Sequence, residues 1–310
     1  MTERISVENS SSNNYYGEDL SVKGAGRSMW AMPISAKRRI SMRSAVIRIS
    51  SLTLFAVAFF SPMCAVAADW DHIHLNVDDT KAGAAWYAKH LGGKVTKAGD
   101  FDAVLFGDKL IKMRKLEGGL GGGVGSPIDH IAFSVQDVDG KLAELRDAGL
   151  TVKTGGRMGR KNRSGEGRSQ TTGRLTDPWG TKIELLHDEE VMGFHHVHLK
   201  SQTSATVAEW YAKASGGEVS NFKDAPAIRA IRFGDVYIFM QRTIRAPLLE
   251  DEPPVDHIAW QSSDFTADVA RLKAMGVRFT MEPVKVGDHR IAFLEGPDGV
   301  KIELVEAVSE

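Results

Sequence analysis

Cysteine is almost absent from this sequence of 310 residues, since Cys64 is the single one. A chain with one cysteine forms no internal disulfide and offers no cluster of thiolate ligands to a metal. The formal net charge is −1 at pH 7, so the composition indicates no general attraction to nucleic acid or to an anionic membrane surface. We therefore expect a globular protein that acts on small molecules and has no nucleic-acid partner.

The N-terminal part of the chain lacks the apolar periodicity of a folded domain and is rich in Ser, Asn and Gly. A basic segment around Arg38 and Arg39 then leads into an apolar run at residues 49–60. That run is short for a membrane-spanning helix, and it is followed by small residues that end at Ala68. Residues 1–68 are interpreted as a disordered N-terminus with a secretory signal peptide. This predicts an exported protein, periplasmic or secreted, with a retained membrane anchor as the alternative.

The rest of the chain repeats itself. Three pairs of similar segments stand in the same order in both halves: 71–75 (DHIHL) and 195–199 (HHVHL), 128–133 (IDHIAF) and 255–260 (VDHIAW), 177–185 (DPWGTKIEL) and 296–304 (GPDGVKIEL). Each repeat begins with an apolar strand, continues with a helix that stops near a glycine, and ends in extended segments. This predicts four βαβββ modules, at 69–127, 128–190, 193–254 and 255–310. Two domains, 69–190 and 193–310, follow from it.

Most of the ten histidines fall on the four strands that open the modules: His72, His74, His130, His195, His196, His198 and His257. Residues two apart on a strand share a face, so His72 and His74 point one way while Ile73 faces the core. The same alternation places Glu184 and Glu303 on polar faces of buried strands. A single strand histidine is more often a surface or hydrogen-bonded residue, but repetition in register favours metal ligands. Two imidazoles with one carboxylate form a facial triad that leaves positions open for a substrate.

Two segments resemble a known family: the strand at 130–133 (HIAF) and the closing segment at 177–184 (DPWGTKIE). They are similar to the vicinal oxygen chelate superfamily, which contains glyoxalases, bleomycin-resistance proteins and extradiol dioxygenases. The resemblance covers approximately residues 69–308. It implies an α+β fold in which four βαβββ modules pair into two open eight-stranded barrels, each with a metal ion in its cleft.

The resemblance also implies which residues bind the metal: one from the first strand of each module and one from the last strand of the second module in a pair. Pairing modules within each half gives two ligand sets: His72, His130 and Glu184, then His196, His257 and Glu303. Modules 1 and 4 form the alternative pair, which joins His72 to His257 and Glu303.

His72 and His196 are preferred as ligands to His74 and His198 because they align with the histidines of the other two modules. We expect His74 and His198 to project into the same clefts. There they are candidate catalytic acids or bases, with hydrogen-bonded fillers as the alternative.

A basic loop at residues 155–174 is a candidate for contact with an anionic substrate through Arg157, Arg160 and Arg174. His289 of the fourth module is a further candidate. The alternative is a loop that is only solvated, as charge-rich loops usually are.

Glyoxalase I members of the family bind the metal with a second glutamate, but the matching strands here, 110–113 (LIKM) and 237–240 (YIFM), have no carboxylate. This argues against isomerisation of a glutathione hemithioacetal. Extradiol dioxygenases have a His, His, Glu set and bind Fe(II). Their additional histidine and tyrosine are only partly matched, by His289 and Phe293 in one half and by Arg174 in the other.

We therefore expect an enzyme that depends on a divalent metal and acts on a small oxygen-bearing substrate, anionic or catecholic, with dioxygenase-like chemistry. The metal is Fe(II), Mn(II), Zn(II) or Ni(II), and the chain is a monomer or a homodimer. The alternatives are a non-catalytic small-molecule-binding protein, like those that confer bleomycin resistance, and a glyoxalase I-like lyase.

Overall fold

The structure is a computed structural model that describes residues 68–117, 125–158, 170–223, 225–249 and 252–308. The predicted signal segment before Ala68 and the predicted substrate residue Arg160 lie outside these residues. Among the helices of the described part, none has the length and apolar character needed to cross a membrane.

Four consecutive βαβββ modules make up the described chain, which confirms the fold predicted from the repeat. Module 1 contains β1 (Asp69–Val77), α1 (Thr80–Leu91), β2 (Lys94–Ala98), β3 (Phe101–Phe106) and β4 (Lys109–Lys115). Module 2 contains β5 (Ile128–Ser134), α2 (Val138–Asp147), β6 (Val152–Met158), β7 (Gln170–Thr176) and β8 (Lys182–Leu186). Module 3 contains β9 (Gly193–Ser201), α3 (Ser204–Ser215), β10 (Val219–Phe222), β11 (Ala225–Phe233) and β12 (Val236–Arg242). Module 4 contains β13 (Val255–Ser262), α4 (Phe265–Ala274), β14 (Phe279–Val286), β15 (His289–Glu295), the 3₁₀ turn η1 (Pro297–Gly299) and β16 (Lys301–Glu306).

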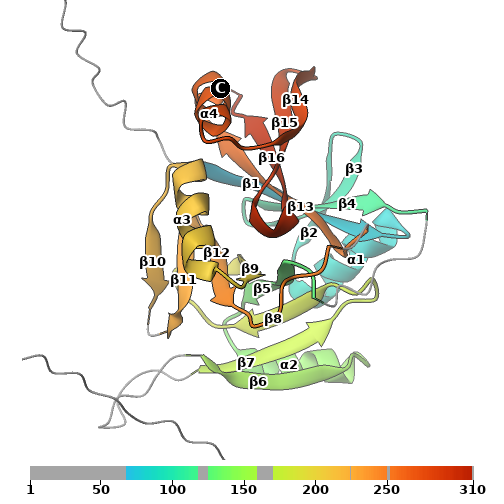
Figure 1. The fold of residues 1–310 in the computed structure, drawn as a ribbon. Coiled ribbons are helices and arrows are strands. Elements are labelled where there is room, and N and C mark those ends of the chain that lie inside the picture. The colour runs from blue at the N-terminus through green and yellow to red at the C-terminus, as the bar shows by residue number, and fades with distance from the viewer. Residues whose placement is uncertain (1–67, 118–124, 159–169, 224, 250–251, 309–310) are drawn as a thin grey trace, which may run out of the picture. The chain divides into compact units, whose positions relative to one another are not determined.

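The modules form two mixed eight-stranded sheets (Figure 1). Sheet A, from modules 1 and 4, has the order β14-β15-β16-β13-β1-β4-β3-β2, and sheet B, from modules 2 and 3, has the order β10-β11-β12-β9-β5-β8-β7-β6. In each sheet the opening strands of the two modules lie antiparallel at the centre, β1 beside β13 and β5 beside β9. The end strands of a sheet do not pair with each other, so neither sheet closes.

This pairing differs from the one expected first, in which each half of the sequence, 69–190 or 193–310, would form its own barrel. The structure has the alternative pairing, of module 1 with module 4 and of module 2 with module 3. Only residues 187–192 separate β8 from β9, and a short connection favours neighbouring positions in one sheet. Longer connections, at 116–127 and 243–254, carry the chain between the sheets.

Local sequence explains the opening strand and helix of module 1. In β1 the side chains of Ile73, Leu75 and Val77 are fully buried, as the alternation predicts for a strand with one face on a core. Helix α1 begins after Asp79, whose carboxylate accepts hydrogen bonds from the N–H groups of the first turn, and it ends at Gly92 with φ 86°. An aspartate cap and a left-handed glycine satisfy backbone groups that a helix end leaves free.

Candidate metal centres

Centre A is the cluster of His72, His257 and Glu303 on the central strands of sheet A. Strand pairing sets His72 opposite Ala259 and Ala259 opposite Glu303, so three neighbouring strands point these side chains to one face. Glu303 Oε2 lies 3.1 Å from His72 Nε2 and 3.1 Å from His257 Nε2. All three residues are buried, with at most 8% of their surface exposed. The three potential donor atoms therefore converge on one point.

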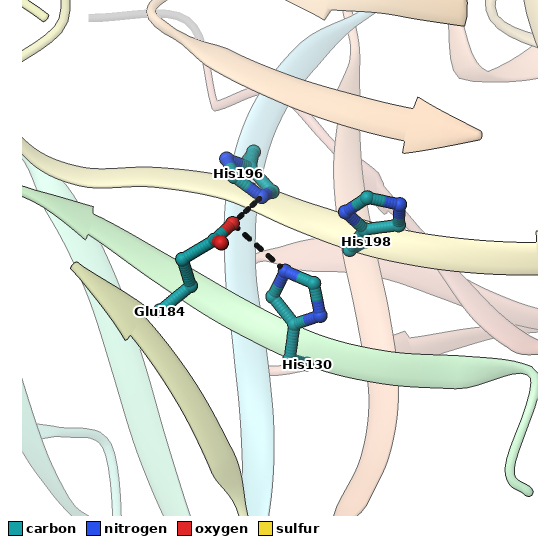
Figure 2. A group of neighbouring side chains, drawn as sticks. All are labelled: His130, Glu184, His196 and His198. Atoms are coloured by element: carbon teal, nitrogen blue, oxygen red, sulfur yellow. Dashed lines mark hydrogen bonds and ion pairs between the residues drawn. The ribbon is translucent and has the colours of Figure 1, made fainter. Parts of the chain in front are cut away.

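Centre B is the corresponding cluster in sheet B: His130 on β5, Glu184 on β8, and His196 and His198 on β9. Figure 2 shows the carboxylate of Glu184 between the imidazoles of His130 and His196. Glu184 Oε2 lies 3.2 Å from His130 Nε2 and 3.8 Å from His196 Nε2. His198 lies directly opposite His130 in the strand pairing, with ring centroids 4.5 Å apart.

All six predicted metal-ligand residues lie in these two centres, but in other groups than those expected first. His72 lies with His257 and Glu303, whereas His130 and Glu184 lie with His196. The sets that joined His72 to Glu184, and His196 to Glu303, assumed pairing within each half. The pairing of module 1 with module 4 and of module 2 with module 3 separates those partners and creates the observed groups.

A β-bulge precedes each of the four histidines that face a glutamate. The extra, unpaired residue is Asp71 on β1, Asp129 on β5, His195 on β9 and Asp256 on β13. A bulge re-aims a side chain that would otherwise alternate to the opposite face. At three positions the bulged aspartate thereby reaches Nδ1 of the next residue: Asp71 bonds to His72, Asp129 to His130 at 2.8 Å and Asp256 to His257 at 2.5 Å.

The carboxylate partners determine which imidazole nitrogen is free. An aspartate accepts the Nδ1 proton, so the Nε2 lone pair points toward the glutamate and is available to a metal ion. These aspartates were not predicted as part of the site. The signal that could have found them is the Asp-His dipeptide at the start of three of the four modules.

The fourth bulge carries a different partner, because His195 replaces aspartate. Its Nδ1 lies 2.8 Å from Nδ1 of His196, and its Nε2 lies 3.1 Å from Oδ2 of Asp188. The other oxygen of Asp188 accepts a hydrogen bond of 2.5 Å from Lys223 Nζ. A chain of fully buried polar groups thus connects His196 to a lysine at the surface.

The pKa shifts of the histidines differ from those of the glutamates in the two centres. Burial lowers the pKa of His130, but hydrogen bonds to Asp129 and Glu184 outweigh burial and raise the pKa overall. His257 behaves in the same way, with hydrogen bonds to Asp256 and Glu303. Burial opposes ionisation of Glu303, yet its hydrogen bonds to His257 and His72 hold its pKa well below the usual range. Each glutamate is therefore an anion beside one histidine, His130 or His257, whose pKa is raised.

His74 and His198, the predicted acid or base residues, lie in centres A and B, and their ring nitrogens have no partner in the described part of the chain. Burial, reinforced by the neighbouring histidines, lowers the pKa of His74 to about 2. Burial and the charge of His130 lower the pKa of His198 to about 3. Both imidazoles are therefore neutral, and their pKa values differ from the near-neutral value on which a proton-shuttle role depends.

The residues of both centres fit a divalent metal ion. In centre B the ligand atoms of His130, Glu184, His196 and His198 all lie within 4.8 Å of one another. The Nε2 atom of His196 and both ring nitrogens of His74 and His198 have no hydrogen-bond partner among the described residues. Buried polar atoms without partners are costly, and coordination would satisfy them. Imidazole and carboxylate donors suit Zn, Fe, Ni and Mn.

A cavity opens beside each centre. The cavity at centre A has about 370 Å³ and is lined by His74 and His257 together with the apolar side chains of Phe101, Met281 and Phe293. The larger cavity, of about 640 Å³, meets centre B at His130 and Glu184, and its wall is more polar, with Lys153, Arg174 and Lys182.

The predicted substrate residues have different positions. Arg174 on β7 lines the cavity at centre B, and its Nη2 donates to Glu184 Oε1 at 3.3 Å. Arg157 belongs to β6, but its side chain lies outside the described part of the structure, as does the whole of Arg160. His289 begins β15 and lines neither cavity, whereas Phe293 of the same strand packs edge-on against His257 at 5.0 Å.

Comparison with known proteins agrees with this architecture. The model of the Glyoxalase/Bleomycin resistance protein/Dioxygenase superfamily matches residues 70–185 and again residues 189–304. The chain therefore belongs to that superfamily and carries two copies of its domain, which confirms the resemblance seen in the sequence.

Solved structures show the same fold. Glyoxalase I from Zea mays has a TM-score of 0.63 and 18% identity, covering 77% of this chain and 92% of that one. A putative dioxygenase from Bacillus subtilis subsp. subtilis str. 168 has a TM-score of 0.59 and 16% identity, covering 78% of this chain and 86% of that one. A comparison with curated proteins finds no match.

Proposed function

We propose that this protein is an enzyme that depends on a divalent metal and acts on a small oxygen-bearing substrate through a His, His, Glu centre, with dioxygenase-like chemistry. The observation that carries the proposal is the convergence of His72, His257 and Glu303 on one point beside a cavity. The preceding aspartates support it, because they orient two of the three donors toward that point. A bound divalent ion would supply Lewis-acid activation and ordering of substrate oxygens.

The chain's own groups provide the rest of the site. Asp71 and Asp256 accept the Nδ1 protons of His72 and His257, which keeps both Nε2 atoms turned toward Glu303. Phe101 and Phe293 form apolar walls of the cavity, so a flat substrate would displace water there.

Charge at the rim of this cavity favours an anionic substrate. Arg114 and Lys301 both bond to Asp256, so two cations share one carboxylate. Lys112 adds a positive charge near the ring of Phe101, at 5.9 Å from its centroid. The wall therefore carries a local excess of positive charge, which attracts anions.

A glyoxalase I-like lyase is less well supported than dioxygenase-like chemistry. The sequence predicted that the fourth strand of modules 1 and 3 lacks a metal-binding carboxylate. In the structure Lys112 on β4 pairs with His74, and Phe239 on β12 pairs with His198. Neither side chain supplies the second glutamate that the hemithioacetal reaction needs as a base.

The proposal is tested by loading the metal-free chain anaerobically with Fe(II), Mn(II), Zn(II) or Ni(II), removing free metal and measuring metal content. Oxygen uptake is then followed with catechols. Glu303→Gln should reduce both metal content and oxygen uptake, whereas Glu282→Gln, an exposed glutamate paired with Lys273, serves as the matched control. A wild-type chain that retains none of these metals contradicts the proposal. A metal-loaded chain that binds catechols without turnover favours the non-catalytic binding protein.

We further propose that the protein is exported. The small residues that end at Ala68 directly precede β1, which begins at Asp69, so cleavage after Ala68 would leave all four modules intact. Mass spectrometry of the protein from periplasmic and cytoplasmic fractions tests this. An intact N-terminus on protein confined to the cytoplasm would contradict export.

A further inference from the structure

One row of side chains crosses sheet B from centre B to the edge of the sheet. Strand pairing places Glu184 on β8 opposite Arg174 on β7, and Arg174 opposite Lys153 on β6. These are the last three strands at that edge (Figure 1). Residues paired across neighbouring strands share a face of the sheet, so all three side chains lie on the face that carries the centre. Two cations therefore follow the glutamate of centre B in one line.

Lys153 and Arg174 are like charges placed side by side. Like charges directly opposite each other on neighbouring strands destabilise a sheet. Among the described residues Arg174 makes one side-chain hydrogen bond, to Glu184 at 3.3 Å, and Lys153 forms no ion pair. A guanidinium has five N–H donors, so most of those of Arg174 remain for a ligand. Both side chains line the cavity of about 640 Å³, where an anion would satisfy the two charges together.

The carboxylates that line the same cavity are already engaged. Asp129 bonds to Lys200 at 2.8 Å, and Asp177 accepts hydrogen bonds from Tyr87 and from two backbone N–H groups. Glu184 is the carboxylate of centre B and is shared with the histidines there. The protein thus balances the charge of the two cations only in part, and the remainder attracts an anion.

Sheet A has an apolar pair at the equivalent place. Glu303 lies opposite Phe293, and Phe293 lies opposite Met281. Both apolar side chains line the cavity at centre A. A βαβββ module therefore folds with apolar residues at these two positions, and the cations of sheet B are not needed to build it. A requirement of the ligand, rather than of the fold, accounts for the charge at these positions.

We propose that Lys153 and Arg174 form an anion subsite beside centre B, which binds a carboxylate of the substrate. The planar guanidinium matches a carboxylate in geometry, and the lysine adds a second charge to the same group. Neighbouring strands lie 4.7–4.9 Å apart, so the subsite is one to two strand spacings, about 5–10 Å, from Glu184. The substrate is then a small molecule with metal-binding oxygens at one end and a carboxylate at the other. This inference rests on the proposed function, because an ion at centre B holds the first end.

The test compares two probes that differ by one carboxylate, catechol and 3,4-dihydroxybenzoate. Both probes carry the same pair of hydroxyl groups for the ion. Calorimetry on Zn(II)-loaded Glu303→Gln, in which centre B keeps all of its candidate ligands, measures both affinities. This chain should bind 3,4-dihydroxybenzoate about 10-fold or more tightly than catechol, the effect of a hydrogen bond between charged groups.

Lys153→Met combined with Arg174→Phe, in the same background, copies the row of sheet A. This change should remove the preference for 3,4-dihydroxybenzoate and leave the affinity for catechol and the Zn(II) content unchanged. The matched control is Lys141→Met combined with Arg146→Met, which removes two positive charges from α2 of the same module, outside the cavity. The control should keep the full preference.

Two outcomes would overturn the anion subsite. One is equal affinity for the two probes before Lys153 and Arg174 are changed. The other is an equal loss of affinity for both probes after the change, because Arg174 would then act only through Glu184 and the ion.

A measurement without metal separates this inference from the proposed function. Benzoate should raise the unfolding temperature of the metal-free wild-type chain more than uncharged benzamide does, because the subsite needs no ion. Lys153→Met combined with Arg174→Phe should abolish that difference. Equal benzoate effects on the wild type and the double variant would overturn the subsite, whereas a wild-type chain that binds no metal contradicts the proposed function instead.

Discussion

The orientation of four imidazoles in the two centres depends on the residue directly before each of them. Asp71, Asp129 and Asp256 each bond to Nδ1 of the next histidine, and His195 takes that role for His196. These contacts need a β-bulge, since adjacent residues of a regular strand point to opposite faces. The repeated Asp-His pair is thus a local motif that orients the imidazole of a candidate metal ligand.

Loss of one such carboxylate should weaken metal binding without removing a ligand. Asp71→Asn removes the charge that accepts the Nδ1 proton of His72, and we expect binding at centre A to weaken by roughly 10–100-fold. Isothermal titration with Zn(II) measures the change. Asp69→Asn, on the exposed start of the same strand, is the control and should bind as the wild type does. Equal affinity of Asp71→Asn and wild type would show that the carboxylate does not orient the ligand.

Metal affinity should fall as pH falls. The metal needs an unprotonated Nε2, and the pKa values of His130 and His257 are raised by their carboxylate partners. Affinity is therefore full above those raised pKa values and is lost as pH drops through them, because protons then compete with the ion. Calorimetry in buffers of different ionisation enthalpy should detect protons released on metal uptake near neutral pH. Uptake without proton release would contradict the raised pKa values.

Strand pairing places a small residue beneath each centre. Ala259 lies opposite both His72 and Glu303, and Ala132 lies opposite both His196 and Glu184. Both alanines are fully buried. An ion held by the surrounding donors would lie above the methyl group, so a larger side chain at either position would occupy its space.

Ala259→Leu should therefore exclude the ion from centre A and leave centre B filled, and Ala132→Leu should have the opposite effect. Overpacking of this kind costs about 1–3 kcal/mol of stability, which the whole domain should tolerate. Metal content and urea unfolding measure the two effects, and each variant is the control for the other. Retention of two ions in both variants would show that the ions do not lie over these alanines.

At the scale of the whole molecule, each centre is built from modules that are not the expected neighbours. Centre A joins the first module to the last, since His72 meets Glu303, and centre B joins the two modules in the middle. Both centres are complete within one chain.

Double variants test this pairing directly. His72→Ala combined with Glu303→Gln should abolish one centre and leave the chain with one ion. His72→Ala combined with Glu184→Gln should abolish both. Pairing within each half of the sequence predicts the reverse outcome, so metal counting by atomic absorption separates the two arrangements. The thermal unfolding of each variant without metal serves as the control for folding.

The sequence by itself determined the elements and indicated the candidate donors. Alternation around Ile73 predicted a strand with its histidines on one face, and repetition of that strand with Glu184 and Glu303 predicted four modules and six ligands. These are local patterns, set by strand period and helix caps, and they survive in any arrangement of the modules. The bulged aspartates were visible as Asp-His pairs, but their contact with the histidine depends on an unpaired residue that only strand pairing creates.

Only the tertiary structure decided which modules pair, and with them which histidine meets which glutamate. The four opening strands are so similar that each is a plausible antiparallel partner for every other, and the choice depends on connection lengths and on burial over the whole core. The same pairing determined the environments of His74 and His198. One lies beside Lys112 and an open cavity, and the other lies beside Phe239 in an aromatic cluster. That difference comes from neighbours distant in the chain, which no repeat in the sequence records.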